Sequence, residues 1–183
     1  MSLQLLSQIV STDTLIFGAV AIPERHRDKM NEHIRLYERS QMGVLFFTTQ
    51  LVYSADCAIW MLEDYDALCK EKGNIPARIV FSFSPFGSVK ALEFMRWLGV
   101  EVPEGTAKRI LSKSSLEARI EASIQVCCEN FRKILYAKQS LGLNVPIGFS
   151  VESISKSKLE FDGAVKLFQR LKLISYLNIK YEK

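Results

Sequence analysis

The chain has 183 residues, of which 48% are hydrophobic and 24% are charged, so it can bury one sizeable core. Its 24 basic and 20 acidic side chains are spread along the sequence and leave a net charge of +4. A nucleic-acid-binding protein would show clustered lysine and arginine with interleaved aromatic residues, so this even pattern argues against that class. We therefore expect a single domain over residues 1–183.

The sequence shows neither a recognisable targeting signal nor a cysteine motif. No apolar run approaches the ~20 residues of a membrane span, so we expect none. The first ten residues lack the basic start of a secretory signal and the arginines of a mitochondrial presequence. The four cysteines lie in expected helices without CxxC spacing, which predicts buried reduced thiols and no metal site. We expect a cytoplasmic protein, with the mitochondrial matrix as the alternative.

In chain order, the sequence predicts strands that alternate with helices. The first strand, residues 15–21, contains only apolar residues and glycine, and Pro23 ends it because proline cannot donate a ladder hydrogen bond. A strand this apolar is expected to be buried on both faces, in a parallel sheet covered by helices. Further strands are expected at residues 43–50, 77–85 and 145–151, and helices at residues 3–10, 27–41, 54–72, 89–98, 117–141 and 161–173. Gly99 and Gly142 are predicted to cap two of these helices.

This order predicts an α/β fold made of about four strand–helix units. Two architectures accept it: an open doubly wound sheet and a segment of a (β/α)₈ TIM barrel. The sequence contains neither a GxGxxG unit nor a GxxxxGK[ST] unit, the usual phosphate-binding signatures of open sheets. A complete barrel needs about 250 residues. We therefore predict a partial barrel.

Polar residues follow the expected strands. Pro23 and His26 come after the first strand and Gln50 ends the second, while Pro85 and Glu152 come at the ends of the third and fourth. Parallel strands place their carboxyl ends at one edge of the sheet, where ligands bind in both architectures. We expect these five residues to line one mouth.

Several blocks of the sequence resemble, in order and spacing, those of methylenetetrahydrofolate reductases. They are Gly18–His26 (GAVAIPERH), Phe47–Gln50 (FTTQ) and Leu92–Pro103 (LEFMRWLGVEVP), while Gly148–Ser155 (GFSVESIS) resembles the last-strand block of a diverged branch. The resemblance covers most of the chain. That family is a (β/α)₈ flavoprotein that reduces methylenetetrahydrofolate with NAD(P)H and FAD. By this resemblance, the chain corresponds to strands five to eight of the barrel.

The resemblance implies cofactor contacts on the first strand–helix unit. His26 resembles a histidine that contacts FAD, and Arg39 stands where the family has a basic residue. Glu32, Arg35 and Arg39 share a helix face because they are spaced by three and four residues. A guanidinium group can donate to two phosphate oxygens, as a diphosphate requires. The expected FAD contacts are therefore His26, Glu32, Arg35 and Arg39.

The resemblance also implies folate contacts. Gln50 resembles the glutamine that hydrogen-bonds the pterin ring, and Thr49 precedes it. Phe94 is expected near the aromatic wall over the substrate.

Other positions depart from the family pattern. Ile22 stands where the family often has a tyrosine, and Ser153 stands where a basic residue would hold a folate carboxylate. The family's catalytic glutamate lies on its first four strands, so we predict no catalytic residue in this chain.

Two functions stay open: one half of a reductase that is inactive alone, or a non-catalytic structural or assembly subunit derived from the family. In either case, a protein partner or a second copy of the chain is expected to complete the barrel, because open sheet edges need burial.

Overall fold

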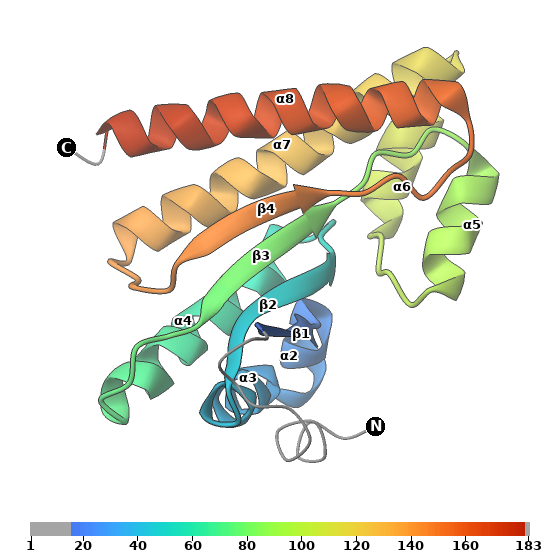
Figure 1. The fold of residues 1–183 in the computed structure, drawn as a ribbon. Coiled ribbons are helices and arrows are strands. Elements are labelled where there is room, and N and C mark those ends of the chain that lie inside the picture. The colour runs from blue at the N-terminus through green and yellow to red at the C-terminus, as the bar shows by residue number, and fades with distance from the viewer. Residues whose placement is uncertain (1–15, 182–183) are drawn as a thin grey trace. The chain divides into compact units, whose positions relative to one another are not determined.

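The structure is a computed structural model that describes residues 16–181, with side chains described to residue 177. The described residues form an α/β fold with a four-stranded parallel sheet in the order β1-β2-β3-β4 (Figure 1). The strands are β1 (Phe17–Ala21), β2 (Val44–Leu51), β3 (Arg78–Phe83) and β4 (Ile147–Val151). The helices are α2 (Pro23–Lys29), α3 (Glu32–Gln41), α4 (Ala55–Glu71), α5 (Val89–Trp97), α6 (Glu104–Leu111), α7 (Leu116–Ser140) and α8 (Lys158–Tyr181). This confirms the α/β class and is consistent with a partial barrel, while a TIM barrel stays a prediction.

The first strand–helix unit differs in detail from its prediction. Pro23 does end the strand, but it also takes the first position of α2, where a missing N–H leaves no hydrogen bond unmade. The helix expected over residues 27–41 is two helices, because Met30 adopts a left-handed conformation with φ of 48°. The N–H of Met30 donates to the His26 carbonyl at 2.7 Å, and α3 begins two residues later. This corner sets the angle between α2 and α3.

Later elements follow the prediction more closely. Gly99 and Gly142 have φ of 83° and 60°, in the left-handed region expected for residues that end helices. Helix α6 was not predicted, and α8 extends beyond residues 161–173 at both ends. The helix expected at residues 3–10 lies outside the described residues. None of the described helices is long and apolar enough to cross a membrane.

The described helices bury one face of β1 and β2. Ala21 and Phe47 are completely buried, and the Phe47 ring contacts Tyr65 of α4 edge-on, with ring centroids 6.4 Å apart. On the other face, the Val20 side chain is 56% exposed. The expectation that the first strand is buried on both faces is therefore wrong, and the strand follows the alternation of a half-covered sheet.

The chain divides into two compact units, and the boundary between them runs through β2, β3 and β4. The first unit comprises the described residues up to Gln50, together with residues 57–81 and 138–148, and the second comprises residues 51–56, 82–137 and those from Phe149 onward. In the second unit, the Phe131 ring of α7 lies between Phe83 of β3 and Phe149 of β4, with centroids 5.8 and 5.4 Å away. The expectation of a single domain stays a prediction.

Candidate functional site

His26 lies in the interior. Its side chain is completely buried on α2, and Nε2 is 3.0 Å from Oδ2 of Asp64 on α4. Helix α4 covers the Phe47 face of β2, so His26 is held on the helix side of the sheet. Gln50 lies on the opposite face of β2. The two residues share the carboxyl-end region of β1 and β2, but their side chains do not line one mouth.

Glu32 joins β1, α2 and α3. Its buried carboxylate accepts a hydrogen bond from the Ile22 N–H at 3.0 Å, and its other oxygen lies 3.3 Å from Nη1 of Arg25. Nε of Arg35 is 3.5 Å from the same oxygen. Arg39 donates from Nη1 to the Val20 carbonyl at 2.9 Å.

The expected cofactor residues therefore have partners within the chain. His26 and Glu32 are buried, and Arg35 and Arg39 reach the surface only in part. A flavin diphosphate would have to displace the existing contacts of both arginines. The arrangement does not fit a ready diphosphate site, and the FAD contacts stay a prediction.

The two expected folate residues on β2 point to opposite sides, because successive side chains of a strand alternate. Thr49 is 4% exposed and faces the helices. Gln50 is half-buried and lies on the face that the described helices leave open. Of this pair, Gln50 is the one that can meet a ligand on the open face.

Three further residues share the open face with Gln50, and sequence reasoning missed them. We call the side chains of Val20, Phe46, Thr48 and Gln50, all in the first unit, the open face. Strand pairing sets Val20 beside Thr48 and Gly18 beside Phe46. A Cβ at Gly18 would lie 2.3 Å from the Phe46 ring, so the ring lies directly over Gly18. The alternation of side chains along the β2 residues before Gln50 is the signal that would have found Phe46 and Thr48.

The open face combines an aromatic ring, a hydroxyl and an amide. Binding sites for small molecules typically pair such apolar surface with a few polar groups that fix orientation. A side-chain amide carries both a donor and an acceptor, and an aromatic face accepts a flat heterocycle. The surface is therefore suited to a planar ligand whose edge carries donors and acceptors.

Phe94 lies in the second unit, on α5. Its ring is 44% exposed and stacks on Trp97, with centroids 5.8 Å apart and an interplanar angle of 17°. Trp97 itself is 79% exposed. Phe94 thus belongs to a surface aromatic pair, and its role over a folate stays a prediction.

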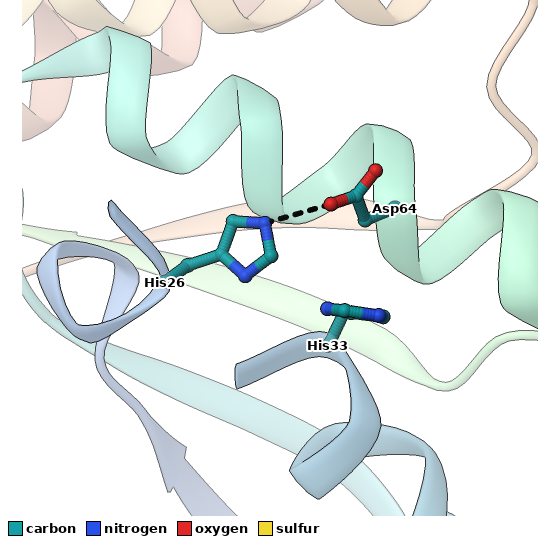
Figure 2. Close-up of side chains that lie close together, drawn as sticks. All are labelled: His26, His33 and Asp64. Atoms are coloured by element: carbon teal, nitrogen blue, oxygen red, sulfur yellow. Dashed lines mark hydrogen bonds and ion pairs between the residues drawn. The ribbon is translucent and has the colours of Figure 1, made fainter. Parts of the chain in front are cut away.

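A second cluster surrounds His26. The His33 ring meets the His26 ring edge-on at 5.1 Å, and Asp64 lies beside both (Figure 2). Burial lowers the pKa of His33, the Asp64 carboxylate opposes this shift, and His26 reinforces it. The four cysteines are buried and unbridged, as expected. The absence of a metal site was predicted from the spacing of the cysteines. That spacing carries no information about a cluster of histidine and aspartate side chains.

An open pocket of about 590 Å³ lies near the amino ends of β2 and β3. It is lined by Ser40, Gln41, Val44, Leu45 and residues 73–78. None of the predicted site residues lines it, and the amino-end face of parallel α/β units more often serves stability than chemistry. The open face therefore remains the better candidate for ligand binding.

Comparison with known proteins gives an informative likeness. No protein-family model matches the chain, and no curated protein matches it. A solved structure is similar, with a TM-score of 0.81 and 32% sequence identity over 93% of this chain. It is an uncharacterized protein from Clostridium thermocellum that binds two copies of 5-methyl-5,6,7,8-tetrahydrofolic acid. The match covers 56% of that protein, so this chain spans little more than half of its length.

Proposed function

We propose that this chain binds a reduced folate of the 5-methyltetrahydrofolate type and belongs to one-carbon metabolism. The observation that carries this proposal is the likeness, at 32% identity and over 93% of the chain, to a protein that binds 5-methyl-5,6,7,8-tetrahydrofolic acid. The sequence blocks that resemble a folate-dependent reductase point to the same ligand class independently.

The open face is the place we propose for the pterin ring. The pyrimidine edge of a pterin presents donors and acceptors side by side, and the Gln50 amide can pair with both kinds. The Phe46 ring offers a flat apolar surface, and the hydroxyl of Thr48 lies on the same face between these two residues along β2. All three side chains belong to one strand, so their spacing is fixed by the backbone.

The finer proposal is a methylenetetrahydrofolate reductase-like protein that is inactive on its own. The reductase reading would add FAD and NAD(P)H as partners of the complete enzyme. Glu32 and His26 favour the non-catalytic alternative for the isolated chain, because both are buried and hold the fold together through Ile22 and Asp64. A protein partner or a second copy of the chain that completes the barrel is part of both proposals.

The test is anaerobic calorimetric titration of the 183-residue chain with 5-methyltetrahydrofolate. We expect saturable binding, and we expect Gln50→Ala to weaken it by roughly tenfold, since the loss of one hydrogen bond to a ligand costs about 1–1.5 kcal/mol. Gln125→Ala, at an exposed position of α7, is the matched control and should leave affinity unchanged. No binding by the wild-type chain, or equal losses in the two variants, would contradict the proposal.

A further inference from the structure

Both histidines of the sequence meet at one point with a carboxylate. His26, His33 and Asp64 each offer one ligand atom, and these three atoms lie within 4.8 Å of one another (Figure 2). The residues come from α2, α3 and α4, all in the first unit. The convergence is therefore a product of the tertiary fold and not of one helix face.

From this geometry we propose that His26, His33 and Asp64 form a binding site for a divalent transition-metal ion such as Zn²⁺. Two imidazoles and one carboxylate are a ligand set that zinc and its neighbours accept, whereas calcium and magnesium require more oxygen ligands than this site offers. The site does not depend on the proposed folate function.

The distances suit such an ion. Zinc ligands lie about 2.0–2.2 Å from the metal, so two ligands in a tetrahedral site are about 3.4 Å apart. Nε2 of His26 and Oδ2 of Asp64 are already 3.0 Å apart. His33 and Asp64 are only partly buried, so side-chain rotation can bring the third ligand atom into place.

An unsatisfied nitrogen atom separates this cluster from an ordinary buried hydrogen bond. Nδ1 of His33 is buried and has no hydrogen-bond partner among the described residues. Buried polar side-chain atoms are usually satisfied, and an exception calls for an explanation such as an ion. His33 can therefore bind through Nδ1 an ion that His26 binds through Nε2, the nitrogen that already faces Asp64.

The backbone holds the two rings in place. Met30 adopts φ of 48° and ψ of 33°, a conformation that a residue with a side chain rarely takes, and so turns α3 back toward α2. This turn lets two histidines seven residues apart meet edge-on. Asp64 then approaches from α4, 38 residues farther along than His26.

The site would keep an open coordination position. His26 is completely buried, but the Asp64 side chain is 45% exposed, so solvent reaches the cluster from the aspartate side. Three protein ligands with water in the fourth position are the arrangement of accessible zinc sites. The bound ion would also tie α2 and α3 to α4.

Zinc titration of the chelator-treated chain tests the proposal. We expect one equivalent of Zn²⁺ to bind and to raise the melting temperature. His33→Gln and Asp64→Asn should each weaken binding by at least about tenfold, and Asp162→Asn, an exposed carboxylate on α8, should not. Circular dichroism of each variant checks that the fold is retained.

Cobalt substitution separates this site from the four buried cysteines. The proposal requires Co²⁺ bands from nitrogen and oxygen ligands without a thiolate charge-transfer band, and requires their loss in His33→Gln. Absence of zinc binding by the wild-type chain overturns the proposal. A thiolate band, or unchanged binding in folded His33→Gln and Asp64→Asn, also overturns it.

Discussion

Glu32 accepts a hydrogen bond from the backbone N–H of Ile22, ten residues earlier, at 3.0 Å. Ile22 precedes α2, where a backbone N–H has no partner within the helix. The completely buried carboxylate therefore closes the connection between β1 and α2 and also anchors Arg25 through an ion pair. A residue that sequence reasoning assigned to a cofactor is a structural anchor in the fold.

Glu32→Ala should destabilise the protein by about 2 kcal/mol, because it leaves the Ile22 N–H without its acceptor while the partly exposed arginines can be solvated. Urea unfolding followed by circular dichroism measures the effect. Glu38→Ala, at an exposed position of the same helix, should change the unfolding free energy by less than about 0.5 kcal/mol. Equal effects of the two substitutions would show that the anchor contributes nothing.

Gly163 allows α8 to pack closely on α7. A Cβ at this position would lie 2.5 Å from Cγ2 of Ile120, a buried, β-branched side chain with little freedom to move. Gly163→Ala should therefore destabilise the protein by about 1–2 kcal/mol, although alanine is the better helix former. Thermal unfolding tests the sign of the change.

Gly105 in α6 provides the matched control. A Cβ there has no neighbour within 4 Å among the described residues. Gly105→Ala should stabilise the protein by up to about 1 kcal/mol, because only helix propensity changes. If both alanines stabilise the chain, the close approach of α7 and α8 at Gly163 is not tight.

The positions of most elements could be predicted because they depend on local patterns. The apolar run that ends at Ala21 and the helical spacing of α7 are visible in sequence, and the glycines that end helices need only their own backbone freedom. Helix α6 was missed because its eight residues carry little apolar pattern, with Ala107 and Ile110 as its buried side chains. The break at Met30 was missed because nothing in that residue type favours a left-handed turn.

The site was harder to predict because its residues come together only in the folded chain. The partner of His26 is Asp64, and no local pattern links residues 38 positions apart. The pairing of Thr49 with Gln50 was assigned from resemblance, but strand alternation sends the two side chains to opposite faces. Sequence patterns located the carboxyl end of β2. They could not show which charged side chains form ion pairs and hydrogen bonds within the fold.

Glu160 predicts the acid response of the second unit. Burial raises the pKa of its carboxyl group, but hydrogen bonds from the Ser155 side chain and from the N–H groups of Gly87 and Ser88 lower it by more, so the net shift is downward. The two backbone bonds measure 3.0 and 3.2 Å. The folded state therefore favours the ionised form.

The direction of the pH effect on folding stability follows from proton uptake. The unfolded chain, with an ordinary glutamate pKa of about 4.3, takes up the proton first as pH falls, so this stabilisation is present above about pH 4.3 and is lost as pH falls through the lower folded value. Urea midpoints between pH 7 and pH 3 should show this loss, and Glu160→Gln should reduce it. Glu93→Gln, on the exposed side of α5, is the control; an identical acid response in wild type and Glu160→Gln would refute the assignment.

Helix α8 carries an exposed apolar stripe. Phe161, Val165 and Tyr176 are 56%, 46% and 61% exposed and lie on one side of the helix. Contiguous apolar surface of this kind marks contacts with partners, so we expect light scattering to give a mass above 20.8 kDa at micromolar concentration. Phe161→Ser with Tyr176→Ser should lower that mass, whereas Ile75→Ser, at a 92% exposed residue in the first unit, should not. A monodisperse monomer would count against a partner.

The resemblance to a reductase leads to a prediction about the affinity of the chain for FAD. Of the expected cofactor residues, His26 and Glu32 are completely buried, so a flavin can be held at the surface only through Arg35 and Arg39. Binding must then displace the bond from Arg39 to the Val20 carbonyl, and an unprepared site binds weakly. We expect FAD affinity no tighter than about 100 µM, which corresponds to roughly 5.5 kcal/mol, and no NADH oxidation by this chain alone. A flavin titration followed by an NADH-oxidation assay measures both.

Arg39→Ala should abolish the residual binding, while Arg132→Ala, an exposed arginine of α7, should leave it intact. Tight flavin binding with turnover would establish an enzyme where we expect a folate-binding protein.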